Sequence, residues 1–193
     1  MGGKAVEQME RIRAADREFF EELFRTHCKG LVGFARRFTQ DHPTAENVVQ
    51  DVFLRLWRDR ERLDTERNLR AYLYAAVRNQ SLSAARHAAI VDHHAQEAAL
   101  VPQAPPTPAD ELRRRSVAEA LEQAIAKLPE RRRLIFIMNR SDHLTYAEIA
   151  EVLEISIKTV ETQMGRALSF LREELVDVLA ERSFTPSWGP RVE

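Results

Sequence analysis

Apolar residues recur along most of the chain at intervals of three and four positions, with polar residues between them. This spacing places the apolar side chains on one face of an α-helix. We find no convincing strand. The short apolar run RLIFIMN, at 133–139, lies between helical patterns and is predicted to be a buried helix. The sequence therefore predicts an all-α fold.

The helical pattern breaks at 88–110, where Pro102, Pro105, Pro106 and Pro108 fall close together. Proline excludes a regular helix here and favours an extended chain. We place a flexible, proline-rich linker at 91–110. It divides the chain into two small helical domains, at 16–90 and 111–182, followed by a tail at 183–193 that is expected to fray.

Two short amphipathic segments lie within 144–168, LTYAEIAEVLEISIKTVETQMGRAL. Thr145 is predicted to cap the first helix together with Glu148, three residues later, and Ser156 is predicted to cap the second. Only Glu154 and Ile155 separate the end of the first segment from the second cap. Two short helices joined by a tight turn are the layout of a helix-turn-helix.

The second of these helices has a polar outer face. If Val160 points to the core, the helical rotation turns outward Lys158, Glu161, Thr162, Gly165, Arg166 and Ser169. Such donors and acceptors suit base edges and phosphates, and a plain solvated helix face fits the pattern equally well.

Upstream, Pro129 suits the first position of another helix, with three consecutive arginines in its opening turns. Positive charge at the start of a helix is unfavourable, because the helix dipole is positive there. The arginines therefore either bind phosphate or are simply solvated.

In the N-terminal domain, residues 67–90 contain four arginines and no acid. We expect a core stripe of Leu69, Tyr72, Leu73, Ala76 and Val77. Measured from Leu69, the side opposite the core then holds Arg67, Arg70, Tyr74, Arg78 and Ser81. Basic and aromatic side chains on one face suit single-stranded nucleic acid, with phosphates on arginine and bases stacked on tyrosine.

The preceding helix has a core stripe of Val49, Val52, Phe53 and Leu56, which leaves Trp57 at its side. Trp57 is either an anchor for a protein partner or a residue packed at the edge of the core.

Composition limits the other possibilities. The formal net charge is −1, so any attraction of nucleic acid must be local. Cys28 is the single cysteine, which excludes an intrachain disulfide and favours a buried structural thiol. His87, His93 and His94 do not match a structural zinc pattern. We expect no metal, no cofactor and no enzymatic activity. The chain has neither a secretory signal nor an apolar run of about 18 residues, so a cytoplasmic protein is expected.

The stretch LPERRRLIFIMNRSDHLTYAEIAEVLEISIKTVETQMGRALSFLREEL resembles region 4 of bacterial sigma factors of the extracytoplasmic-function group. Glu154 and His143 replace two turn glycines of the family pattern, and VETQ stands where VKSR is frequent. The resemblance implies that this domain binds the −35 promoter element as a duplex. The residues expected at that duplex are Arg131, Arg132, Arg133, Ser156, Lys158, Thr159, Glu161, Thr162, Gln163 and Arg166.

The N-terminal half resembles sigma region 2 through AENVVQDVFLRLW and LRAYLYAAVRN. The first motif implies docking on the clamp coiled coil of the RNA polymerase β′ subunit by Gln50, Asp51, Arg55 and Trp57, with Phe53 in a structural role. The second implies capture of the unpaired −10 strand by Arg67, Arg70, Tyr74, Arg78 and Asn79. Asn47 and Ser83 stand where the family often has aspartate.

Taken together, the two resemblances imply a sigma factor that directs core RNA polymerase to promoters. The implied partners are core polymerase, through its β′ and β subunits, promoter DNA and an anti-sigma factor. The protein would have no stable membrane association and would join the nucleoid when bound to polymerase. Two alternatives remain open at this point. The first is a LuxR-type regulator, because SIKTVETQ also resembles the output domain of that class, which binds duplex operators. The second is a helical adaptor that binds other proteins and no DNA.

Overall fold

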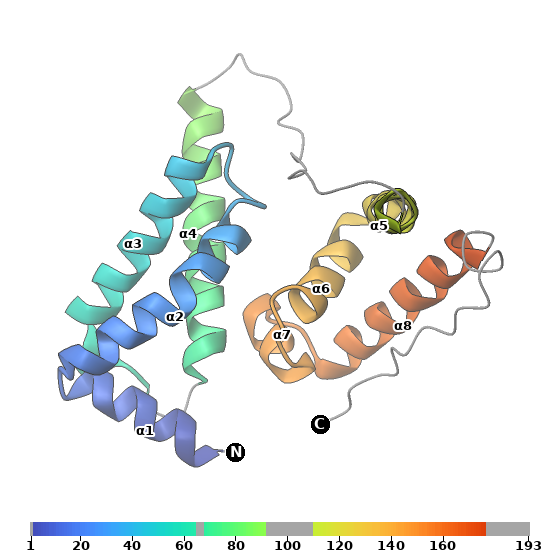
Figure 1. The fold of residues 1–193 in the computed structure, drawn as a ribbon. Helices are drawn as coiled ribbons and strands as arrows, with labels where there is room; N and C mark the ends of the chain where they lie inside the picture. Colours follow the sequence, from blue (N-terminus) through green and yellow to red (C-terminus); the bar gives the residue numbers. More distant parts are fainter. Residues whose placement is uncertain (1, 65–67, 92–109, 177–193) are drawn as a thin grey trace. The chain divides into compact units, whose positions relative to one another are not determined.

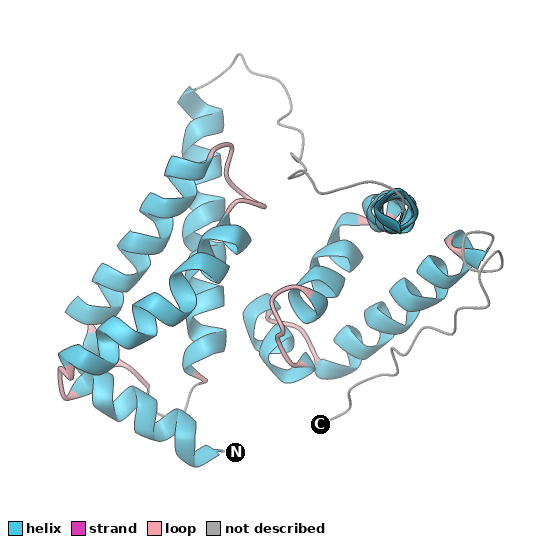
Figure 2. Ribbon diagram, viewed as in Figure 1, coloured by secondary structure: helices cyan, strands magenta, loops and turns pink. Residues whose placement is uncertain are grey.

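The computed structural model describes residues 2–64, 68–91 and 110–176. Every regular element in these ranges is helical, and they contain no strand (Figure 2). The all-α prediction is confirmed. The chain divides into two compact units near residue 100. The predicted linker at 91–110 and the predicted tail lie almost wholly outside the described residues, so their conformation stays a prediction.

The first unit contains α1 (Gly2–Arg13), α2 (Arg17–Ala35), α3 (His42–Arg58), the short 3₁₀ helix η1 (Arg60–Arg62) and α4 (Leu69–Val91). Helices α2, α3 and α4 pack on one another, as Figure 1 shows. Fully buried side chains from each of them form the core, among them Leu31, Phe34, Leu56, Leu69 and Leu73. Burial of this apolar surface, at about 25 cal/mol per Å², is the main stabilising contribution.

Side-chain caps fix where the first helices begin. The Asp16 carboxylate accepts a hydrogen bond of 2.9 Å from the backbone N–H of Phe19, and the Asp41 carboxylate accepts one of 2.7 Å from Thr44. Both lower the pKa of the aspartate, because the bond favours the charged form. The stretch DHPT, at 41–44, therefore forms the start of α3.

Helix α1 lies before the predicted domain start at residue 16. Its Met9 and Ile12 are fully buried, and it packs on α2, α4 and η1. The Arg11 guanidinium lies 4.3 Å from the centre of the Phe19 ring and pairs with Asp16 at 2.7 Å. The helical unit therefore includes residues that the sequence pattern did not assign to it.

The second unit contains α5 (Asp110–Lys127), α6 (Glu130–Arg140), α7 (Tyr146–Leu153) and α8 (Ile157–Glu174). Helix α8 packs on α5 and α6. The predicted buried helix at 133–139 is confirmed as part of α6, where Ile135, Phe136 and Met138 are buried. Pro129 is the residue just before α6 rather than its first residue, one position from the prediction.

The helix-turn-helix is formed by α7, a three-residue turn and α8. Val160 is fully buried beneath it, as the pattern predicted, and Ala150 is also buried. Glu154 in the turn and His143 before α7 both have φ of 54°, in the left-handed region. Glycine adopts this region without steric cost, whereas other residues pay about 1–2 kcal/mol. The turn geometry is retained although the glycines are not.

Candidate nucleic-acid interface

Both predicted caps of the helix-turn-helix are present. The Thr145 hydroxyl accepts from the Glu148 N–H at 3.2 Å, and the Thr145 N–H donates to the Glu148 carboxylate at 2.8 Å. Ser156 Oγ accepts from the Thr159 N–H at 3.0 Å and lies 2.8 Å from the Thr159 hydroxyl. These bonds fix the first turn of α8, so Ser156 and Thr159 have a structural role beside any contact with DNA.

The outer face of α8 carries a positively and a negatively charged side chain. Lys158 has 85% of its side chain exposed, and its ammonium pairs with the Glu161 carboxylate at 3.1 Å; 47% of the Glu161 side chain is exposed. The Thr162 hydroxyl donates to the backbone carbonyl of Lys158 at 2.8 Å. Gly165 and Arg166 continue this exposed surface toward the middle of the helix. The outward orientation predicted from Val160 is thus present in the structure.

A shallow groove runs between α6 and α8. Arg132 Nε donates to the Gln163 side-chain oxygen across it at 3.3 Å. The groove is lined by Arg132, Thr162, Gly165, Arg166, Ser169, Phe170 and Glu173. Two guanidinium groups, of Arg132 and Arg166, therefore lie beside the outward face of α8.

The three arginines at the start of α6 separate in space. Arg131 is exposed, and Arg132 lines the groove. Arg133 instead donates to the backbone carbonyl of Ala126 at 3.0 Å, near the C-terminal end of α5. This bond satisfies a carbonyl at a helix end and gives Arg133 a structural role.

Helix α4 departs from the predicted arrangement. Tyr74 is only 4% exposed and Ser81 is fully buried, so the prediction that both lie opposite the core is wrong. The Tyr74 ring packs edge-on against Phe34, with ring centres 4.9 Å apart. Its hydroxyl lies 3.5 Å from the position that a Cβ on Gly30 would occupy. Three helices surround α4, so its buried arc is wider than one stripe.

The other predicted residues of α4 remain accessible. Arg70 is half-buried, with its guanidinium 5.9 Å from the centre of the Tyr74 ring. Arg78 is half-buried and donates to the exposed Asn79 at 3.4 Å, a long and weak bond. Arg67 lies outside the described residues. The basic part of the predicted face is retained, whereas its aromatic part is buried.

The exposed side of α3 carries Gln50, Asp51, Leu54 and Arg55. Leu54 is 67% exposed and was not among the predicted contact residues. Its position off the core stripe of α3 was the available signal. Single exposed apolar side chains are common on protein surfaces. Leu54 therefore adds one apolar side chain beside the predicted contact residues of α3.

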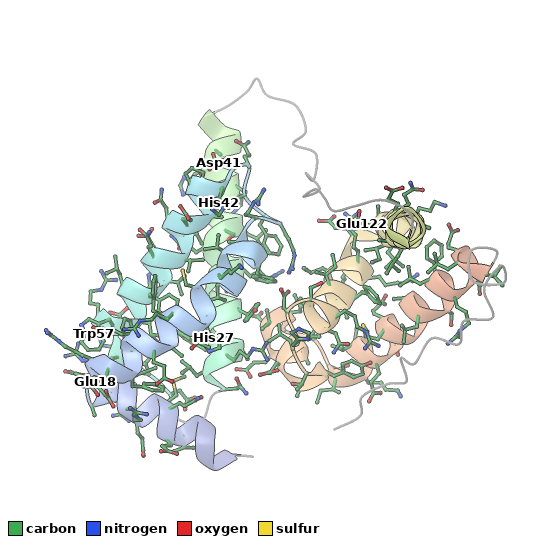
Figure 3. All side chains as sticks on the ribbon, viewed as in Figure 1. Glu18, His27, Asp41, His42, Trp57 and Glu122 are labelled. Atoms are coloured by element: carbon green, nitrogen blue, oxygen red, sulfur yellow. The ribbon has the colours of Figure 1, made fainter. Side chains whose placement is uncertain are left out.

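Trp57 lies at the edge of the core, beside α2 (Figure 3). Its ring centre is 4.8 Å from that of Phe20, and the Arg60 guanidinium lies 5.2 Å from its ring. Arg60 also donates to the Trp57 carbonyl at 2.9 Å. The neighbouring Phe53 is 2% exposed, in agreement with its predicted structural role. Trp57 thus packs in the core and keeps a partly exposed edge.

Two titratable groups on α2 are shifted by burial. Burial lowers the pKa of His27, and the nearby charge of Arg70 lowers it further. Burial raises the pKa of the Cys28 thiol, and Glu46 adds to the effect. A raised pKa keeps the thiol protonated and unreactive. Within the part of the chain that the structure describes, no three His, Cys, Asp or Glu residues are grouped to hold a metal.

Comparison with known proteins places this geometry in a family. Residues 23–90 match the family model "Sigma-70 region 2", and residues 118–171 match "Sigma-70, region 4". The chain is 30% identical over 168 residues to the ECF RNA polymerase sigma factor SigL of Mycobacterium tuberculosis, covering 86% of this chain and 93% of SigL. The chain belongs to the extracytoplasmic-function (ECF) group of RNA polymerase sigma factors.

Other sigma factors are similar over most of their length. The ferric citrate uptake sigma factor FecI of Escherichia coli is 29% identical over 150 residues, covering 77% of this chain and 86% of FecI. Among solved structures, CnrH in complex with the cytosolic domain of CnrY aligns with a TM-score of 0.59 at 24% identity, covering 90% of this chain and 97% of that one. The alignment with CnrH shows that the two proteins share a fold.

The family match decides between the sigma factor and the LuxR-type regulator, the two classes that share this helix-turn-helix. A LuxR-type regulator would share the helix-turn-helix only, whereas this sigma factor also matches the region 2 model over residues 23–90. In the described residues, no helix has the length and apolar character that a membrane span requires.

Proposed function

We propose that this ECF sigma factor recruits core RNA polymerase to its promoters through three separate surfaces. The outer face of α8, with the groove beside it, binds the −35 element as a duplex. The basic side of α4 holds the melted −10 strand, and the exposed side of α3 docks on the β′ clamp coiled coil. The observation that supports this most is the presence of both region 2 and region 4 in one chain, on separate compact units.

Some of the proposed duplex contacts position α8 on the DNA, and others read the base sequence. Arg132 and Arg166 flank the α6–α8 groove and attract phosphates, which fixes the register of α8 on the duplex. The part of α8 proposed to face base edges carries Lys158, Glu161 and Thr162, and Gln163 follows at its margin. Arg131, exposed in the first turn of α6, is proposed as a further phosphate contact. The docking is that of a recognition helix in the major groove.

The single-strand contacts use Arg70, Arg78 and Asn79, with Arg67 in the preceding segment. Guanidinium groups bind phosphates and stack on bases. Tyr74 is buried, so it supports α4 from within and offers no ring face on which a base could stack. This sigma factor makes and breaks no bond itself; it positions DNA for the polymerase, in the cytoplasm and on the nucleoid.

The α3 docking surface consists of Gln50, Asp51, Leu54 and Arg55, and the exposed edge of Trp57 lies beside it. Leu54 supplies an apolar anchor that is desolvated on binding, and the surrounding polar groups set orientation. CnrH binds the cytosolic domain of CnrY, and the RpoE of Bartonella quintana binds the anti-sigma factor NepR. We propose that an anti-sigma factor likewise restrains this chain by covering its docking surfaces.

The test is run-off transcription by purified core polymerase on a promoter library, with and without the full chain. Asp51→Arg is expected to prevent holoenzyme formation, because it reverses a charge on the docking surface. Arg78→Ala and Arg166→Ala are expected to form holoenzyme normally but to yield few specific transcripts. Arg25→Ala, an exposed cation on α2 that pairs with Glu21, is the control and should behave as the wild type. Specific transcripts that do not depend on the added chain would contradict the proposal.

A further inference from the structure

Lys158 and Glu161 form an exposed ion pair at the start of the recognition helix, 3.1 Å apart. Glu161 carries a negative charge on a face that is proposed to approach DNA phosphates. Repulsion there reduces affinity for any duplex, whatever its sequence. A carboxylate in this position therefore requires an explanation other than general DNA binding.

Helix stability does not supply that explanation. Lys158 lies in the first turn of α8, which contains no acidic residue. Helix dipoles favour acids near the N-terminus and bases near the C-terminus, and a glutamate followed by a lysine is the more stabilising order of such a pair. The pair in α8 has the opposite order. Exposed ion pairs also contribute little, about 0–1 kcal/mol.

The chemistry of the pair matches one kind of base pair. The Lys158 ammonium offers only donors and the Glu161 carboxylate only acceptors. In the major groove, a C·G pair presents guanine N7 and O6 as adjacent acceptors and cytosine N4–H as a donor beside them. An A·T pair places its one donor between two acceptors, which would repel a carboxylate aimed at it.

We propose that Glu161 and Lys158 read one C·G base pair of the −35 element together. Glu161 accepts a hydrogen bond from cytosine N4, and Lys158 donates to guanine O6 and N7. The bond between Lys158 and Glu161 in the free protein holds both side chains on the face that meets the base pair. This inference rests on the proposed insertion of α8 into the major groove and adds the identity of one base pair to it.

The proposal makes an unusual prediction for Glu161→Gln. Removing one negative charge should strengthen binding to duplexes of unrelated sequence, or leave it unchanged. The cytosine preference should nevertheless fall, because an amide both donates and accepts. A good base contact discriminates by about 1–3 kcal/mol, so the loss should be at least about fivefold. A side chain with a merely structural role would not separate the two effects.

The experiment uses holoenzyme assembled from the full chain and core polymerase. Duplexes are selected from a randomised library, and the base preference at each position is measured for the wild type, Glu161→Gln and Glu122→Gln. Glu122 is an exposed acid on α5, outside the α6–α8 groove, so its variant makes the same change of charge in the same unit away from the proposed DNA surface. Both variants change exposed side chains, and thermal melting verifies their folding.

We expect Glu161→Gln to lose a cytosine preference at one position and Glu122→Gln to keep it. Replacing the paired guanine by 7-deazaguanine should weaken the wild type but not Lys158→Ala. An unchanged preference in Glu161→Gln, or an equal loss in Glu122→Gln, overturns the inference while the proposed function stands. If the wild-type holoenzyme selects no duplex sequence, the proposed −35 function fails and this inference fails with it.

Discussion

Gly165 offers a test that separates stability from DNA binding. It lies within α8, and a Cβ built on it meets no atom within 4 Å. Its backbone does not have positive φ, so the helix itself does not require glycine. Glycine inside a helix costs about 0.5–1 kcal/mol relative to alanine. Gly165→Ala should therefore stabilise the C-terminal unit by about that amount, or raise its Tm by about 2–8 °C.

The same substitution should weaken promoter binding. Gly165 lines the groove beside the outer face of α8. If this surface binds DNA as proposed, the absence of a side chain lets DNA approach the helix backbone here, and a methyl group obstructs that approach. We expect the holoenzyme to bind its promoter at least about fivefold more weakly, although the protein is more stable. Thermal unfolding and equilibrium binding at one salt concentration measure the two effects.

Gly33→Ala is the matched control. Gly33 lies within α2, and a Cβ there also meets no atom within 4 Å. Its substitution should stabilise the first unit by a similar amount and leave promoter binding unchanged. If Gly165→Ala is more stable and binds as tightly as the wild type, no DNA approaches the backbone at this point. If it is less stable, the space above Gly165 is not open as the structure shows.

Three further substitutions test the fold. Glu154→Gly should stabilise the C-terminal unit by about 1 kcal/mol in urea unfolding, because residue 154 has positive φ; a loss of stability would contradict this. Thr145→Ala removes the side chain that caps α7 and should cost about 0.5–2 kcal/mol in the same assay, and an unchanged midpoint would refute the cap. Burial, then the charge of Arg70, lowers the pKa of His27, so the unfolded chain takes up a proton there at a pH where the folded chain does not. Its contribution to stability is full above about pH 6.5 and declines as pH falls toward the lower folded pKa; His27→Asn should lose this part of the pH dependence, and a profile identical to the wild type would exclude His27 as its source.

Local signals in the sequence were sufficient for the helix-turn-helix. A capping box such as Thr145 with Glu148 involves neighbouring residues only, so its letters predict its hydrogen bonds. The outward side of α8 followed from one buried residue, Val160, because a single helix rotation relates the two. The left-handed turn was less evident, since Glu154 stands where glycine would have indicated it.

Tertiary packing limited the other predictions. Tyr74 was placed opposite the core by rotation from Leu69, but α4 is surrounded by three helices and buries a wider arc. Among the residues of α1 whose burial the structure describes, the fully buried apolar ones are Met9 and Ile12, a pattern too weak to assign the helix to the unit. Arg133 reaches back to α5, a contact that no local pattern contains. The position of a residue that packs against segments distant in sequence can be established only from the structure.

The most direct test of this account is transcription by core polymerase with the purified full chain on the promoter library. The account predicts specific transcripts only when the chain is present. It also predicts that Asp51→Arg loses holoenzyme formation, while Arg166→Ala keeps the holoenzyme but loses promoter selection. An Arg166→Ala holoenzyme that starts at the same promoters with the same efficiency as the wild type would contradict the assignment of the α8 face to DNA.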